Sequence, residues 1–293
     1  MNNIPAIATP SRTSGILNRH HLKAKHSLGQ NFLIDLNVLR EIMDAANLTA
    51  DDDVIEIGPG IGGLTEQLAQ RAHKVIAFEI DSHLIPILHE TLSQYHNVKI
   101  INQDILKANL PKIIKNDFDS SRKVKIVANL PYYITTPIIV ELMKSNARFS
   151  SIAVTMQKEV AERVSAKPGS KTFGAISVLI QYLNNVKITN LIPKTAFYPS
   201  PKVTSAIVRL TRRHDVKTKV FEDDAFAGFV RGCFAHRRKT FQNNLKSLFG
   251  KDARPVIKKV LTQEKVNPML RPEKLSVETY VKLANAFHQV GLL

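Results

Sequence analysis

The stretch Asp53-Val54-Ile55-Glu56-Ile57-Gly58-Pro59-Gly60-Ile61-Gly62-Gly63-Leu64-Thr65 decides the fold of this chain of 293 residues. Its first residues form an apolar run typical of a buried strand, and a glycine-rich turn follows. Apolar residues then recur at helical spacing from Leu64 to Ala72. Because glycine has no Cβ, such a turn lets the backbone approach a bound cofactor closely. The stretch therefore predicts a nucleotide-type site between a strand and a helix.

The glycine pattern allows two interpretations of the cofactor. Gly58, Gly60 and Gly63 match the dinucleotide pattern G-x-G-x-x-G, so a nicotinamide-dependent oxidoreductase is one of them. Glu56 precedes the first glycine by two residues and extends the pattern to Glu-x-Gly-x-Gly-x-Gly. That acid favours a cofactor with a cationic amino-acid tail, such as S-adenosylmethionine, over one with a pyrophosphate.

Further strand patterns follow along the chain, with helical patterns between them, at Lys74–Asp81, Val98–Ile105 and Val124–Ala128. This alternation predicts a doubly wound, Rossmann-like α/β sheet that binds ligands at the carboxyl ends of its strands. Glycine or polar residues stand at these ends, namely Gly58, Glu79, Asp104 and Asn129. Glu79 lies 21 positions after Gly58, where an acid can accept hydrogen bonds from ribose hydroxyls. We expect Asp104 to receive the adenine amino group of the cofactor.

The segment Asn129-Leu130-Pro131-Tyr132-Tyr133 offers a binding site for a second planar group. The Asn129 side-chain carbonyl and the Leu130 backbone carbonyl are convergent acceptors, which suit an exocyclic amino group. Tyr132 can stack on a base, and Phe197, held in an extended loop by two prolines, can form a second stacking wall. Taken alone, the segment is equally compatible with an ordinary turn that ends a strand.

Composition points to a polyanionic partner. The chain has 41 Lys and Arg against 25 Asp and Glu, a net charge of +16, and a pI near 9.9. We therefore expect nucleic acid rather than an anionic membrane surface. No apolar run approaches the roughly 18 residues of a spanning helix. The single Cys233 permits no intramolecular disulfide, and we expect no metal site. Residues 1–22 show no periodicity, so we expect a flexible N-terminal tail.

Several segments together resemble the ribosomal RNA adenine N6-dimethyltransferases, most closely those that modify small-subunit rRNA, over roughly residues 23–290. They are His26-Ser27-Leu28-Gly29-Gln30-Asn31-Phe32-Leu33, Glu56–Gly62, Asn129–Tyr132 and Phe197-Tyr198-Pro199-Ser200-Pro201-Lys202-Val203. The resemblance implies a class I methyltransferase that binds S-adenosylmethionine through Asn31, Leu33, Gly58, Glu79, Asp104 and Asn129. It implies that Asn129, Tyr132 and Phe197 hold the target adenine, with the Leu130 carbonyl as second acceptor, and that Gln30 helps to close the pocket.

The resemblance also implies a reaction and its partners. We expect dimethylation of N6 on two adjacent adenosines near the 3′ end of small-subunit rRNA, within the immature small ribosomal subunit. The enzyme is then expected to be a cytoplasmic monomer that needs no metal and contacts no membrane. One alternative is a large-subunit rRNA methylase of the macrolide-resistance type. Another is a ribosome-assembly factor whose role is mainly non-catalytic.

The domain prediction places the methyltransferase domain at residues 23–211 and a smaller all-α domain at residues 212–293. Residues 212–293 carry 17 Lys and Arg against 8 Asp and Glu, a net charge of +9. Within them, Arg237, Arg238 and Lys239 lie on the polar side of a helical pattern. We expect these cations to bind RNA phosphates, since structured RNA is recognised largely by shape and backbone.

Overall fold

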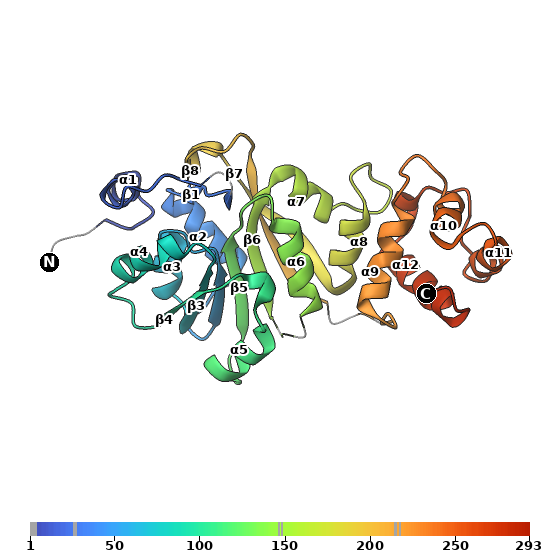
Figure 1. Ribbon diagram of the computed structural model, residues 1–293, viewed down its shortest axis with the longest axis horizontal. Coiled ribbons are helices and arrows are strands. Elements are labelled where there is room, and N and C mark those ends of the chain that lie inside the picture. Colours follow the sequence, from blue (N-terminus) through green and yellow to red (C-terminus); the bar gives the residue numbers. More distant parts are fainter. Residues whose placement is uncertain (1–4, 26–27, 146, 148, 214–215, 217) are drawn as a thin grey trace. The chain divides into compact units, whose positions relative to one another are not determined.

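The computed structural model describes residues 5–25, 28–145, 147, 149–213, 216 and 218–293. The chain divides into two compact units (Figure 1). The first comprises Met1–Ala161 and Lys187–Arg212, and the second comprises Glu162–Val186 and Arg213–Leu293. The border near residue 212 agrees with the predicted one. The segment 162–186 belongs to the second unit, contrary to the predicted methyltransferase domain of residues 23–211.

A seven-stranded sheet organises the first unit, with the strand order β4-β3-β2-β5-β6-β9-β7, and the first residues of β7 belong to the second unit. The strands are β2 (Asp53–Ile57), β3 (Lys74–Glu79), β4 (Val98–Asn102), β5 (Val124–Asn129), β6 (Ser151–Gln157), β7 (Asn184–Ile192) and β9 (Ser205–Arg212). From β4 to β6 neighbouring strands are parallel, and β9 joins β6 antiparallel. The chain builds outward from β2 to β4 and then returns to β5 on the other side. This reversal places the carboxyl ends of β2 and β5 side by side, as the doubly wound prediction requires.

Helices connect these strands, and a short ribbon is formed by residues far apart in sequence. The helices are α1 (Pro10–Arg19), α2 (Leu36–Ala45), α3 (Gly63–Ala69), α4 (Ile85–Thr91), α5 (Leu110–Asp117) and α6 (Thr135–Lys144), and α7 (Lys158–Val164) crosses the unit border. The ribbon pairs β1 (Phe32–Leu33) with β8 (Phe197–Tyr198) antiparallel, with Leu33 opposite Phe197. Strand β2 is buried along its whole length, as a central parallel strand should be.

The N-terminal segment is a docked helix, so the prediction of a flexible tail over residues 1–22 is wrong for its described part. Thr9 caps α1, and Ile16 and Leu17 on its inner face are buried against α4. The backbone N–H of Ile7 donates to Glu66 Oε2 at 2.7 Å. Sequence reasoning missed this helix because it is short and polar residues interrupt it, so packing against the sheet unit rather than propensity stabilises it.

Among the described residues, the elements that lie wholly within the second unit are helices. They are α8 (Ala175–Leu183), α9 (Asp223–Cys233), α10 (Phe241–Phe249), α11 (Arg254–Gln263) and α12 (Val277–Gln289). Aromatic side chains from α9, α10 and α12 fill their common core, among them Phe229, Phe241 and Tyr280. Helix α8 contributes Val178 and Tyr182 to the same core, which explains why residues 162–186 fold with the second unit. This unit corresponds to the expected smaller helical domain, with a helix added from an earlier part of the chain.

Candidate active site

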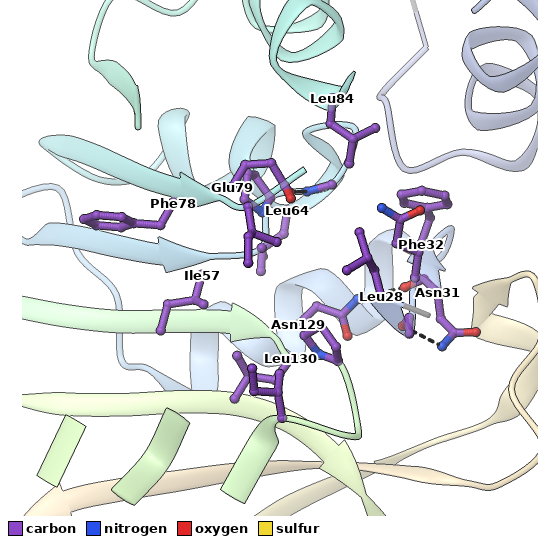
Figure 2. Close-up of a pocket in the computed structure, with 18 of the residues that line it drawn as sticks. Leu28, Asn31, Phe32, Ile57, Leu64, Phe78, Glu79, Leu84, Asn129 and Leu130 are labelled. Atoms are coloured by element: carbon purple, nitrogen blue, oxygen red, sulfur yellow. Dashed lines mark hydrogen bonds between the residues drawn. The ribbon is translucent and has the colours of Figure 1, made fainter. Parts of the chain in front are cut away.

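A pocket opens at the carboxyl ends of β2, β3 and β5 and encloses about 1090 Å³ including its mouth. Its lining includes every residue predicted for the cofactor and the target base: Asn31, Leu33, Gly58, Glu79, Asp104, Asn129, Leu130, Tyr132 and Phe197. Figure 2 shows Glu79, Phe32 and Asn129 around this space. Asn31 and Phe197, which are 166 positions apart in the sequence, thus meet at one site.

The glycine turn leaves room on its pocket side. Gly58 has φ +71°, and a Cβ built there would meet no atom within 4 Å. Gly60 has φ +63°, but a Cβ on it would lie 3.1 Å from the Phe32 ring. Both positions require glycine for their backbone conformation. At Gly60 glycine also permits packing against Phe32, whereas at Gly58 it leaves space that a ligand can fill.

The two acids at the ends of β3 and β4 are placed differently. Glu79 is buried; its Oε2 accepts from the Gly60 N–H at 3.2 Å and its Oε1 from the Asp81 N–H at 2.8 Å. Burial raises the pKa of Glu79, and these backbone hydrogen bonds oppose the rise. Asp104 is half-buried and accepts from the Leu106 N–H through Oδ1 alone. Among the described residues no partner binds Asp104 Oδ2, which remains available to a ligand.

The segment before β1 bridges the pocket from the end of β3 to the end of β5. Lys25 Nζ lies 2.8 Å from Asp81 Oδ2, and Gln30 Nε2 donates to the same oxygen at 3.2 Å. The Asn31 carbonyl accepts from Asn129 Nδ2 at 3.0 Å. Burial would raise the pKa of Asp81, but the hydrogen bonds from Lys25 and His83 outweigh it and lower that pKa. Of the predicted motif, His26 and Ser27 lie outside the described residues.

The Asn129 amide has a defined orientation. Its Nδ2 donates to the Asn31 carbonyl, and its Oδ1 accepts from Thr155 Oγ1 at 2.6 Å. Because a carbonyl only accepts, the contact with Asn31 fixes which end of the amide is the oxygen. The Leu130 backbone carbonyl accepts no hydrogen bond from any described residue. Two acceptors therefore belong to adjacent residues that both line the pocket, as the sequence predicted.

Two aromatic side chains belong to this end of the pocket. The hydroxyl of Tyr132 lies 2.5 Å from Ser205 Oγ, and burial raises the pKa of Tyr132. Phe197 is only 3% exposed and packs in the core beneath the pocket that it lines. Their stacking role remains a prediction, since it concerns a base that the structure does not contain.

Glu56 is not among the described residues that line the pocket. It is fully buried, and neither carboxyl oxygen has a hydrogen-bond partner among the described residues. Burial raises its pKa to about 8; Thr65 opposes the rise and the nearby Glu79 adds to it. The structure thus gives no support for direct contact between Glu56 and a cationic cofactor tail.

Sequence reasoning missed other parts of the site. Leu28, Gln103 and Tyr133 also line the pocket, and Thr155 and Ser205 bind residues that do. Tyr133 stands inside the quoted motif, where its 57% exposure could not be foreseen. The sequence did not single out Thr155 and Ser205, because a single hydroxyl side chain is common in an apolar strand.

The predicted RNA-binding residues lie in the second unit. Arg237, Arg238 and Lys239 are exposed in the connection between α9 and α10, not on a helix as the pattern predicted, and the Arg237 guanidinium donates to the Lys171 carbonyl. Their role remains a prediction.

Within the described part of the chain, no group of three or more His, Cys, Asp or Glu side chains is arranged to hold a metal ion. Likewise, none of the helices described here is long and apolar enough to cross a membrane.

Comparison with known proteins identifies the family. The profile of the family "Ribosomal RNA adenine dimethylase" matches residues 21–289. "Ribosomal RNA small subunit methyltransferase A" of Levilactobacillus brevis is 55% identical, covering 100% of this chain and 99% of the relative. The protein of the same name from Pediococcus pentosaceus is 49% identical over 100% and 99% of the two chains.

Solved structures agree with this assignment. A dimethyladenosine transferase from Plasmodium falciparum has a TM-score of 0.71 and 26% identity, covering 88% of this chain and 98% of that one. The 23S rRNA methyltransferase ErmE has a TM-score of 0.66 and 27% identity, covering 88% and 100% of the two chains. Both likenesses extend over most of the chain, and the family profile covers the glycine turn and the Asn129 segment alike. The chain therefore belongs to the ribosomal RNA adenine dimethylase family.

Proposed function

We propose that this protein is an S-adenosylmethionine-dependent enzyme that dimethylates N6 of two adjacent adenosines near the 3′ end of small-subunit rRNA. Family membership and relatives named for the small ribosomal subunit at up to 55% identity support it. The observation that carries the chemistry is the pair of acceptors on Asn129 and Leu130, in the same pocket as the glycine turn. The nicotinamide interpretation leaves these acceptors unused.

The residues present fit S-adenosylmethionine. The empty space beside Gly58 admits a ligand close to the backbone, and Asp104 Oδ2 is an acceptor without a partner among the described residues. When bound, S-adenosylmethionine supplies an electrophilic methyl group. The residues proposed to hold it line the pocket: Asn31, Leu33, Gly58, Glu79, Asp104 and Asn129. Glu79 would accept from hydroxyls with the lone pairs that Gly60 and Asp81 leave free.

Asn129, Leu130, Tyr132 and Phe197 are proposed to prepare the target adenine. The N6 lone pair is delocalised into the ring, which makes it a weak nucleophile. When Asn129 Oδ1 and the Leu130 carbonyl accept the two N–H groups, they hold the amino group and turn its lone pair toward the methyl donor. Stacking on Tyr132, with Phe197 behind it, offsets the few kcal/mol that a base loses on leaving its stack. Proximity and orientation then supply most of the catalysis.

The second unit is proposed to hold the rRNA. Its Arg237, Arg238 and Lys239 are exposed, and the chain carries a net charge of +16. Such cations bind phosphates and position a structured RNA without reading its sequence. The proposed partner is the immature small ribosomal subunit, and the enzyme is proposed to act as a cytoplasmic monomer with a role in subunit biogenesis.

The substrate is tested with labelled S-adenosylmethionine and two purified particles, unmodified small subunits and unmodified large subunits. We expect label to enter the small-subunit rRNA only. Label in the large-subunit rRNA alone would establish the macrolide-resistance type of reaction instead. Tight binding to small subunits without any transfer would establish a non-catalytic assembly factor.

A further inference from the structure

Thr155 on β6 fixes the acceptor end of Asn129. The two residues are partners in the parallel register of β5 and β6, and Thr155 Oγ1 lies 2.6 Å from Asn129 Oδ1. Thr155 is fully buried, so no water competes for this contact. Asn129 Nδ2 is meanwhile held by the Asn31 carbonyl. The amide is therefore bound at both ends, and Oδ1 keeps its second lone pair for a ligand.

Ser205 on β9 makes the equivalent contact with Tyr132. Its Oγ lies 2.5 Å from the Tyr132 hydroxyl, and it too is fully buried. Strand β9 lies next to β6, where Ser205 is opposite Gln157 and Ile207 is opposite Thr155. The two buried hydroxyls thus come from β6 and β9, the two strands that follow β5 in the sheet order. Neither belongs to the described residues that line the pocket.

We propose that Thr155 and Ser205 are positioning residues for methyl transfer, Thr155 through the Asn129 amide and Ser205 through the Tyr132 ring. This inference rests on the proposed function. An Asn amide that turns by half a rotation presents its NH2 to the target amino group, so two donors face each other. A Tyr ring without its hydroxyl contact can tilt away from the base plane. Either error misplaces the N6 lone pair.

The orientation effect should appear in kcat. We expect Thr155→Val and Ser205→Ala each to lower kcat about tenfold, within the roughly hundredfold that a 1 Å misplacement costs. In Ser205→Ala, the KM and dissociation constant for S-adenosylmethionine should stay within about twofold of wild type, because its partner Tyr132 is not among the residues proposed to hold the cofactor. Thr155→Ser keeps the hydroxyl, so its kcat should lie within about twofold of the wild-type value. The matched control is Ser151→Ala, which removes a buried hydroxyl at the other end of β6, where it donates to the Ala46 carbonyl.

A double-mutant cycle distinguishes an effect of Ser205 on the position of Tyr132 from a general disturbance of the fold. Tyr132→Phe removes the same hydrogen bond as Ser205→Ala, so it should lower kcat to the same extent. If Ser205 acts through the Tyr132 hydroxyl, adding Ser205→Ala to Tyr132→Phe should change kcat by less than about twofold. If Ser205→Ala does not fold, Tyr132→Phe alone tests the link, and unchanged kcat would overturn it.

The assay is methyl transfer to unmodified small subunits, with cofactor affinity measured on the same preparations. The inference is overturned if Thr155→Val or Ser205→Ala keeps wild-type kcat, or if Thr155→Ser is as slow as Thr155→Val. It is equally overturned if Ser205→Ala slows Tyr132→Phe as much as it slows wild type. Failure of the proposed function is distinguishable, because the wild-type enzyme itself would then transfer no methyl groups.

Discussion

Glu56 makes the stability of the protein depend on pH in a way that one substitution should remove. The side chain is fully buried on β2 without a hydrogen-bond partner among the described residues, and burial raises its pKa from 4.5 to about 8. Below pH 4.5 the folded and unfolded states both hold the proton. Between pH 4.5 and 8 only the folded state holds it, so the free energy of unfolding falls as pH rises. Above about pH 8 both states have lost the proton, so Glu56 causes no further decrease in the free energy of unfolding.

The magnitude follows from the two pKa values. At about 1.36 kcal/mol per unit, the difference between 4.5 and about 8 corresponds to an upper limit of about 5 kcal/mol. Glu56→Gln keeps the size of the side chain and carries no titrating proton. The variant should therefore match wild type near pH 5 and exceed its stability by several kcal/mol at pH 9. Other groups that titrate in both proteins largely cancel in this difference.

Urea unfolding of wild type and Glu56→Gln at pH 5, 7 and 9 measures the effect. The midpoint difference at pH 5 is the internal control, because Glu56 is protonated there in the folded protein. A stability difference between the two proteins that stays constant from pH 5 to pH 9 would refute the assignment of a neutral, buried carboxyl. So would a difference that shrinks as pH rises, since that is the sign expected for a carboxylate stabilised in the folded state.

Further predictions concern the pocket and the RNA surface. Asn129→Ala should lower kcat at least roughly a hundredfold, because it removes an acceptor and the contact with Thr155. Gly58→Ala should weaken cofactor binding, because the methyl group enters the open space and strains a φ of +71° by roughly 1–2 kcal/mol. Ile16→Ala should destabilise the protein by roughly 2–5 kcal/mol, because Ile16 is buried against the sheet unit. Changing Arg237 and Arg238 together to Ala should weaken RNA binding and reduce the salt slope by up to about 2.

Each of these predictions has its own measurement. Methyl transfer at the wild-type rate in Asn129→Ala would contradict the acceptor mechanism. Calorimetric titration with S-adenosylmethionine checks Gly58→Ala, and unchanged affinity would place the cofactor elsewhere. Urea unfolding checks Ile16→Ala, where unchanged stability would mean that α1 is not docked in solution. RNA binding at several salt concentrations checks the arginine pair against Lys258→Ala with Lys259→Ala, two exposed lysines on α11. Equal losses in both pairs would relocate the RNA site.

The site was predictable from sequence because of a topological rule. Gly58, Glu79, Asp104 and Asn129 each follow an apolar strand, and parallel strands bring their carboxyl ends to one edge of the sheet. Their convergence on one pocket therefore needed no knowledge of side-chain packing. The resemblance to known methyltransferases added Asn31 and other residues on loops, which topology alone does not place.

The parts that sequence reasoning missed depend on tertiary packing. Helix α1 forms because Ile16 and Leu17 find an apolar surface on α4, which no local pattern reveals. Helix α8 joins the second unit because Tyr182 packs on Phe226, about 40 residues further along the chain. Each hydroxyl of Thr155 and Ser205 is one polar group in an apolar strand. Their contacts with Asn129 and Tyr132 depend on how the strands pair, which the sequence alone does not give.

The central claim is that this pocket methylates adenine N6 in small-subunit rRNA. The most direct test incubates the protein with labelled S-adenosylmethionine and unmodified small ribosomal subunits, digests the RNA and identifies the labelled nucleosides and their positions. We predict N6,N6-dimethyladenosine at two adjacent positions near the 3′ end, and none with Asn129→Ala. Label on another nucleoside, or on another atom of adenine, would contradict the account.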